Sequence, residues 1–155
     1  MRPVSARHMA SQLHYLTVQD ILWINLQVTE NVQTFSYAKL EEATYYQYSY
    51  GASNSLIPQA ARLLTGFPKL SPLTTGNAQT TFIACLTFLE INGMTIDLTD
   101  EKGADWFTDA ASKKVDGATA IQSIAKPSTG HHDLEIRKTI RDLVDAYPKT
   151  LKALA

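Results

Sequence analysis

The chain has 155 residues, of which 45% are hydrophobic and 19% are charged, enough for one domain with a buried core. Its formal net charge of −1 lacks the clustered excess of Lys and Arg that is typical of nucleic-acid binding, so we expect no nucleic-acid partner. No apolar run approaches the roughly 18 residues that cross a bilayer, so we expect no membrane association. The single cysteine, Cys85, excludes an internal disulfide and a thiol-rich metal site, and it is compatible with a cytoplasmic location.

The first residues of the chain differ in character from the rest. Residues 1–12 are polar and lack the apolar centre of a signal peptide, so we interpret them as an N-terminal extension or a cloning remnant. Residues 13–155 are assigned to a single domain. Within it, Cys85 lies in an apolar stretch, which predicts a buried side chain whose thiol pKa is raised.

Two helices are predicted in the first third of the chain. Thr17 and Asp20 have the spacing of a capping box, and the apolar residues behind them support a helix to about residue 29. A second helix is predicted over residues 37–48. Its expected core contacts are Ala38, Leu40, Ala43 and Tyr45.

The third and fourth helices lead to the centre of the chain. Ser55 begins the third, and we expect Gly66 and Pro68 to end it early. The fourth is predicted from Asn77 to about Asn92, where Asn-Gly predicts a left-handed stop. This fourth helix is apolar on nearly all sides, which indicates a position at the centre of a bundle.

The remaining signals are mostly helical. We predict a helix over residues 100–114 with Trp106 and Phe107 facing inward, a short turn over 118–125, and an amphipathic helix over 133–146 that Pro148 ends. Residues 94–98 are a weak strand candidate. The predicted fold class is therefore all-α: a compact bundle of about six helices around a central apolar helix, with an extra C-terminal helix over about 131–155.

The central loop and helix carry the motifs of a known family. They read Ser71-Pro-Leu-Thr-Thr-Gly-Asn-Ala-Gln-Thr80, followed by Phe88-Leu-Glu-Ile-Asn-Gly93. This resembles the Fic/Doc (death-on-curing) family, whose signature His-Pro-Phe-x-Asp/Glu-Gly-Asn-Lys/Gly-Arg-Thr precedes a helix ending in Phe-Leu-x-x-Asn-Gly. Leu40-Glu-Glu-Ala43 and Tyr50-Gly51 are further landmarks. The resemblance covers roughly residues 16–125 and implies a Fic/Doc-like helical fold.

What the resemblance implies about chemistry depends on three substituted positions. In the family, the histidine deprotonates a target hydroxyl, the acid helps to hold Mg²⁺, and the arginine clamps a nucleotide phosphate. This chain has Ser71, Thr75 and Gln79 there, and Ala78 at the family's lysine or glycine. A serine hydroxyl is far too weak a base to replace an imidazole whose pKa is about 6.5. Threonine and glutamine supply no charge. Residues that shape the turn are kept, namely Pro72, Gly76, Asn77 and Thr80.

Two functions are compatible with this pattern. The first is a catalytically silent domain that needs no cofactor and binds a protein or peptide partner, such as a small antitoxin-like protein, or a weakly held anion. The anion would lie on backbone amides of Gly76, Asn77 and Ala78, although helix capping by Thr75 or Asn77 also accounts for these residues. The second is an active AMP- or phosphotransferase, the toxin of a toxin–antitoxin-like system, which would use ATP with Mg²⁺.

A tyrosine cluster adds a candidate contact surface. Residues 45 and 48 share one helical face and 46 and 50 another, so half of these tyrosines are expected in the core. Tyr46 and Tyr50 are the candidates for an exposed patch that contacts a partner.

A histidine pair raises the question of a metal. Adjacent His131 and His132 rarely share one ion, and Glu135 is the only further ligand at helical spacing. We interpret the stretch as a solvated helix start and expect no metal site.

Overall fold

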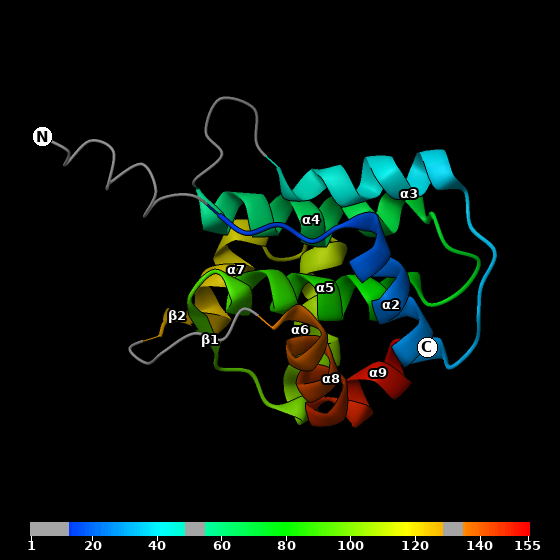
Figure 1. The fold of residues 1–155 in the computed structure, drawn as a ribbon. Coiled ribbons are helices and arrows are strands. Elements are labelled where there is room, and N and C mark those ends of the chain that lie inside the picture. Colours follow the sequence, from blue (N-terminus) through cyan, green and yellow to red (C-terminus); the bar gives the residue numbers. More distant parts are fainter. Residues whose placement is uncertain (1–12, 49–54, 129–134) are drawn as a thin grey trace, which may run out of the picture.

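The architecture is taken from a computed structural model, which describes residues 13–48, 55–128 and 135–155. Over these ranges the chain is all-α, as predicted, with eight α-helices, one 3₁₀ turn and a two-stranded sheet at the periphery (Figure 1). None of the helices in these ranges is both long and apolar enough to cross a membrane. The elements are α2 Val18–Thr29, α3 Tyr37–Thr44, η1 Tyr45–Gln47, α4 Leu56–Leu70, α5 Asn77–Ile91, β1 Met94–Ile96, α6 Asp100–Ala111, α7 Gly117–Ile124, β2 Ala125–Pro127, α8 Ile136–Ala146 and α9 Pro148–Ala153.

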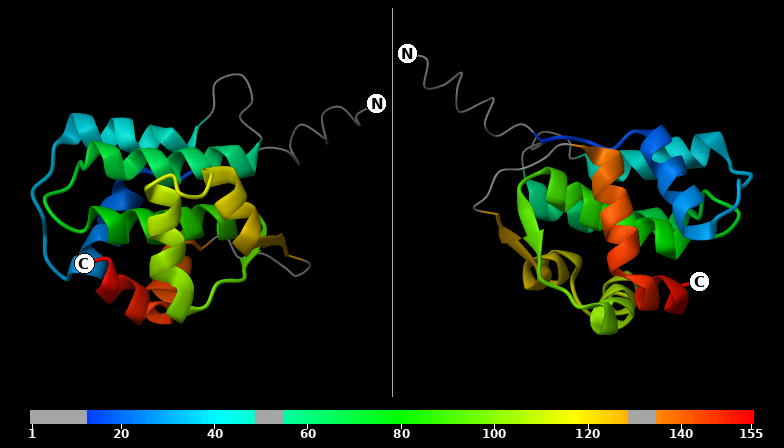
Figure 2. Two further views of the ribbon diagram at one scale, coloured as in Figure 1. Left: turned by 180° about the vertical axis from the view of Figure 1, so that it is seen from behind. Right: turned by 60° about the horizontal axis from the view of Figure 1, so that its bottom comes forward.

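Helix α5 is the centre of the fold, which confirms the prediction from its apolar sequence. Every residue from Gln79 to Leu89 is buried. Helices α2, α4 and α8 pack directly against α5, and Figures 1 and 2 show them on different sides of it. A side chain on any face of α5 therefore meets protein and not water, which is why a sequence without a polar face forms this helix.

The buried position of Cys85 is also confirmed. Its side chain has no exposed surface, and burial raises the pKa of the thiol to about 12. Cys85 is therefore protonated and serves as a small apolar residue of the core.

Helix α2 begins as the sequence predicts. The Thr17 hydroxyl accepts a hydrogen bond from the Asp20 amide at 3.1 Å, and the Asp20 carboxylate accepts one from the Thr17 amide at 2.8 Å. Both halves of the capping box are present, and two amides of the helix start gain partners.

Helix α3 is shorter than predicted, and this changes which side chains it buries. It ends at Thr44 and continues as the 3₁₀ turn η1, in which each residue advances by a larger angle than in an α-helix. Tyr45 is consequently 55% exposed, and Ala38 is exposed as well, so these two expected core contacts are wrong. Leu40 and Ala43 are fully buried, as predicted.

Helix α4 continues through Gly66 and Pro68, so the predicted early end is wrong. An internal proline costs about 3 kcal/mol because it removes a hydrogen bond and clashes with the preceding turn. Leu63, Leu64 and Phe67 have no exposed surface, and each contributes about 1.5–3 kcal/mol by burial. Their combined burial exceeds the cost of the proline, and packing extends the helix to Leu70.

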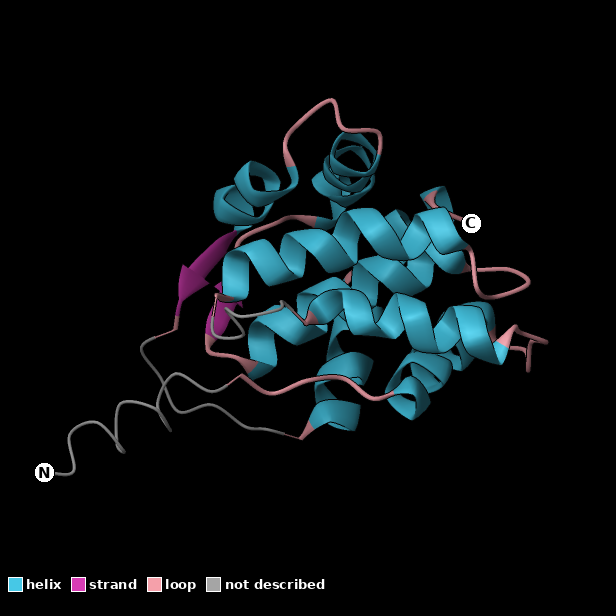
Figure 3. Cartoon of the chain, turned by 90° about the horizontal axis from the view of Figure 1, so that it is seen from above, coloured by secondary structure: helices cyan, strands magenta, loops and turns pink. Residues whose placement is uncertain are grey.

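The weak strand candidate is confirmed over residues 94–96. β1 pairs antiparallel with β2, with Thr95 opposite Lys126, and the pair lies at the edge of the molecule (Figure 3). β2 was not predicted, and the expected turn before it is the helix α7. Gly93, with a φ of 94°, makes the predicted left-handed turn into β1.

The C-terminal region forms two helices, where one was expected. Its predicted start at residues 131–134 lies outside the described residues, and α8 ends at Ala146. Pro148 then occupies the first turn of α9, where a missing amide hydrogen costs nothing. The predicted end of the amphipathic helix before Pro148 is therefore confirmed, whereas α9 was not predicted. Together, α7 and α9 raise the number of α-helices above the six expected.

The central position of α5 predicts that core truncation there is costly. Leu86→Ala removes a fully buried side chain and should lower the free energy of unfolding by about 2–5 kcal/mol through cavity formation. Val32→Ala, at a side chain that is 90% exposed, is the matched control and should change it by less than about 0.5 kcal/mol. Urea unfolding of the two variants measures the difference, and equal losses would contradict this placement of α5.

Candidate functional site

Ser71 ends α4 in the left-handed conformation, with a φ of 44°. Its side chain is exposed, and its hydroxyl donates a 2.8 Å hydrogen bond to the carbonyl oxygen of Pro68. The Ser71 hydroxyl is thus directed back toward its own helix.

The loop between α4 and α5 is held in shape by Asn77. Its side-chain oxygen accepts from the Leu73 amide at 3.0 Å, and its side-chain nitrogen donates to the Leu73 carbonyl at 2.8 Å. No side-chain cap hydrogen bond is found at the described start of α5, so the expectation that Thr75 or Asn77 caps this helix is wrong. Asn77 instead closes the loop onto itself.

Gly76 is required by both conformation and space. Its φ of +79° lies in the left-handed region that favours glycine. A Cβ at this position would lie 2.5 Å from Cγ2 of Thr29 and 3.0 Å from Nδ2 of Asn25. The loop therefore approaches α2 closely at this point, and packing of the turn explains why a glycine is needed.

Asn25 joins α2 to this loop, and the sequence analysis missed it. It is 2% exposed, and its Nδ2 donates to the carbonyl oxygen of Thr75 at 3.0 Å and to Oγ1 of Thr80 at 3.2 Å. A single amide within the otherwise apolar face of the predicted first helix was the signal that could have identified it. Asn25 satisfies two polar groups that the turn would otherwise bury.

Gln79, at the position of the family arginine, is occupied by an internal contact. Its side chain is 8% exposed, and Nε2 donates a 2.7 Å hydrogen bond to the carbonyl oxygen of Leu151 in α9. The side chain of Gln79 therefore contacts helix α9.

Helix α6 holds helix α9 in place next to Gln79. The Asp100 carboxylate accepts from the amides of Lys149 at 2.9 Å and Thr150 at 2.8 Å. Gly103 permits the close crossing, because an added Cβ would overlap the Thr150 hydroxyl. Burial, followed by nearby carboxylates, raises the pKa of Tyr147 to about 12, so its hydroxyl keeps its proton and donates to the Leu98 carbonyl at 2.7 Å.

A second segment lies along the other side of the loop. The Ser36 amide donates to the Pro72 carbonyl at 3.1 Å, and the Thr74 amide donates to the Thr34 carbonyl at 3.2 Å. The hydroxyls of Thr34 and Thr74 are 2.6 Å apart and share a hydrogen bond. The backbone edge that the loop presents at residues 72–74 is therefore paired with the chain's own residues 34–36.

The substituted positions do not share a set of contacts. Ser71 bonds to Pro68, Thr75 has an exposed side chain, Ala78 is half-buried against the core, and Gln79 bonds to Leu151. The proposed anion position, Gly76 with Asn77 and Ala78, lies at the start of α5, where backbone amides of the first turn gather. Binding of an anion there stays a prediction.

The tyrosine cluster is arranged differently from the expectation. Tyr46 is half-buried, with its ring against Gly66 and the Arg62 guanidinium 5.9 Å from its centroid. Tyr45 and Tyr48 are the more exposed pair, at 55% and 39%. Tyr50 lies outside the described residues.

The histidine pair is likewise outside the described part of the chain. Within the described ranges, no three His, Cys, Asp or Glu side chains are grouped as they would be around a metal ion.

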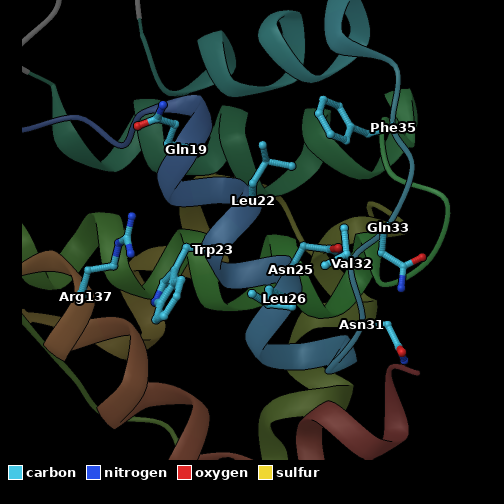
Figure 4. A pocket seen from close by; sticks show the side chains of 10 residues that line it. All are labelled: Gln19, Leu22, Trp23, Asn25, Leu26, Asn31, Val32, Gln33, Phe35 and Arg137. Carbon is cyan, nitrogen blue, oxygen red and sulfur yellow. The ribbon is translucent and has the colours of Figure 1, made fainter.

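A cavity of about 250 Å³ lies beside α2, a short distance along the helix from the loop (Figure 4). Its apolar lining comes from Leu22, Trp23 and Leu26 of α2 and from Val32 and Phe35 of the following segment. Its polar lining consists of the amides Gln19, Asn25, Asn31 and Gln33 and the guanidinium of Arg137. The cavity and the loop share Asn25.

Arg137 and Trp23 lie together at one end of the α2 cavity, and Val32 and Phe35 lie at the other (Figure 4). The guanidinium carbon of Arg137 is 4.4 Å from the centroid of the Trp23 ring, which is a cation–π contact. The Nε1–H of Trp23 is buried without a hydrogen-bond acceptor in the described structure. The sequence analysis did not predict this contact, because the two residues come from helices more than a hundred positions apart; the charge pattern around Arg137 predicts a solvated helix face.

Comparison of the chain with protein-family models, with curated proteins and with solved structures gives no match.

The hydrogen bonds from the start of α9 to the Asp100 carboxylate predict that the stability of the protein depends on pH. Partial burial acts to raise the pKa of Asp100, but hydrogen bonds from the Thr150 and Lys149 amides outweigh it and hold the pKa below its usual range. The lowered pKa means that this stabilisation is present above the unfolded value of about 3.9 and is lost as the pH falls through the folded value. Asp100→Asn should therefore destabilise the protein at pH 7.

The difference between wild type and Asp100→Asn should shrink as the pH falls below about 4, in urea unfolding followed across that range. Asp105→Asn, on an exposed position of the same helix, is the control. A difference that is independent of pH would contradict the role of the ionised carboxylate.

Proposed function

We propose that the protein is a catalytically silent Fic/Doc-like domain that acts by binding a protein or peptide partner. The observation that carries the proposal is the α2 cavity together with the apolar side chains exposed around it. Val32 at its rim is 90% exposed and Phe35 is 41% exposed. A single exposed apolar residue is ordinary, but these two side chains lie next to the apolar lining of one cavity. Exposed apolar side chains that adjoin an apolar cavity are typical of an interaction surface.

The internal contacts of the loop support the proposed lack of catalytic activity. Gln79 has no charge and is bonded to Leu151, and the hydroxyl of Ser71 is bonded to Pro68. A phosphate clamp needs a charged group that is free to reach its ligand, and a general base needs a pKa near neutrality. The groups present at these positions supply neither.

The size of the cavity supports a partner side chain over a nucleotide. Its volume of about 250 Å³ is below the roughly 300–1,000 Å³ that sites for drug-sized ligands occupy. One or two apolar side chains of a partner fit such a volume better. A small antitoxin-like protein in the cytoplasm is the kind of partner that the Fic/Doc resemblance implies, and the protonated, buried Cys85 is compatible with that compartment.

The proposed surface can be tested without knowing the natural partner. A phage-displayed library of random twelve-residue peptides, selected on the wild-type protein, should yield peptides that bind through two or more apolar residues. Val32→Asp places a charge at the cavity rim and should weaken these peptides about tenfold or more, because their apolar side chains lose a dry contact.

Tyr37→Asp, at a side chain that is 60% exposed but does not line the cavity, is the matched control. Fluorescence anisotropy with the selected peptides gives the affinities. If the library yields no binding peptides, or if Val32→Asp does not change their affinity, the proposed binding surface is contradicted.

Nucleotide titration tests whether the loop between α4 and α5 lacks the ability to bind nucleotides. ATP, ADP and GTP should bind weakly or not at all to the wild type, with no gain from Mg²⁺, because the charged contacts to phosphate and metal are missing. The combined change Ser71→His, Thr75→Asp, Ala78→Lys and Gln79→Arg should produce Mg²⁺-dependent binding in calorimetry, since it restores the family's base, acid and clamp.

Ala78→Lys alone is the control for non-specific attraction of phosphate. Micromolar, Mg²⁺-dependent ATP binding by the wild type would support an active transferase instead. If the folded quadruple variant binds no nucleotide at millimolar concentration, the four side chains do not meet at one site. The proposed Fic/Doc-like nature of the domain would then be rejected.

A further inference from the structure

We propose that the partner segment recognised by the α2 cavity carries a carboxylate that binds Arg137, next to apolar side chains that enter the cavity. This inference rests on the proposed function and names the chemistry of the partner. It assigns a binding role to Arg137, which lies on α8, beyond the part of the chain that the Fic/Doc resemblance covers.

The charge of the cavity is the first reason. Arg137 is the single ionisable residue among those that line it, because the other polar lining residues are neutral amides. No acidic residue of the described structure forms an ion pair with Arg137. On the same helix, Lys138 and Asp142 are paired with each other at 2.9 Å. The end of the cavity at Arg137 therefore carries a positive charge that forms no ion pair with any described residue, and it is complementary to an anionic group.

The second reason is the conformation of the Arg137 side chain. Its guanidinium stacks on the Trp23 ring, with the carbon 4.4 Å from the centroid, while the side chain as a whole is exposed. Stacking orders the long side chain and leaves the N–H groups at the edge of the guanidinium plane available to an acceptor. An arginine that is already ordered loses less entropy when it binds a carboxylate.

The order of the lining residues along the cavity indicates where the bound partner segment carries its charged and its apolar side chains. Figure 4 shows Arg137 and Trp23 at one end, Leu22 and Leu26 between, and Val32 and Phe35 at the other end. A segment that fills the cavity therefore places its carboxylate beside Trp23 and its apolar side chains between α2 and the segment that follows it. We infer a peptide with two apolar residues and one Asp or Glu on the same side.

The test is a charge reversal at Arg137. Peptides selected from the random library on the wild-type protein should be enriched in Asp or Glu. Arg137→Glu should weaken them about tenfold or more, since a charge-assisted hydrogen bond is lost and a repulsive pair is created. A fresh selection on Arg137→Glu should favour Lys or Arg at the same peptide position.

Arg141→Glu is the matched control. It makes the same change of charge on the exposed side of the same helix, four residues further on, at a position that does not line the cavity. It should leave the affinities within about twofold, which separates a local contact from a general effect of net charge.

The outcomes separate this inference from the proposed function. Binding that Val32→Asp weakens but Arg137→Glu does not would overturn the carboxylate contact and leave the proposed surface standing. Peptides without enrichment in acidic residues would overturn it as well. Absence of any binding peptide would overturn both proposals together.

Tryptophan emission provides an independent readout. The chain has two tryptophans, so Trp106→Phe leaves Trp23 as the single emitter. A carboxylate that binds the guanidinium stacked on Trp23 places a negative charge beside the indole, so the Trp23 emission should shift on titration with an acidic peptide. Binding that leaves the emission of Trp23 unchanged would contradict the inferred position of the carboxylate.

Discussion

The burial of α5 on all of its faces is the constraint on which the rest of the structure depends. A helix with no polar face cannot rest on a surface, so the chain has to supply neighbours around its whole circumference. Helices α2, α4 and α8 meet this requirement directly, although they come from the beginning, the middle and the end of the sequence. The loop that precedes α5 thereby lies against α2, and the first turn of α5 lies against α9, so the contacts of both depend on these helices.

Amide side chains carry most of the polar structure around that loop. Asn77 closes the loop, Asn25 ties it to α2, and Gln79 ties the first turn of α5 to α9. Each amide satisfies buried backbone groups that would otherwise be costly. A charged arginine or aspartate in such places would have to be desolvated, whereas a neutral amide donates and accepts at little cost. Neutral amides at these positions therefore suit the internal contacts that they make.

The proposed binding surface lies beside α2, a short distance along the helix from the loop. There the chain leaves apolar side chains in contact with water and one guanidinium without an ion-pair partner in the described structure. Asn25 lines this cavity and also holds the carbonyl of Thr75, so the two regions share one rigid element. The α2 helix thus contacts both the loop that precedes α5 and the proposed binding surface.

The sequence by itself determined the all-α class, the central place of α5, the capping box at Thr17, the burial of Cys85 and the turn at Gly93, because each depends on neighbouring residues or on the apolar pattern of one segment. The tertiary structure decided the extension of α4 through Pro68, the start of α9 at Pro148 and the exposure of Tyr45, since packing overrode local preferences there. It also decided the contacts of Gln79 with Leu151 and of Arg137 with Trp23. These contacts join positions far apart in the chain, and no local pattern of residues encodes which distant helix will meet a given side chain.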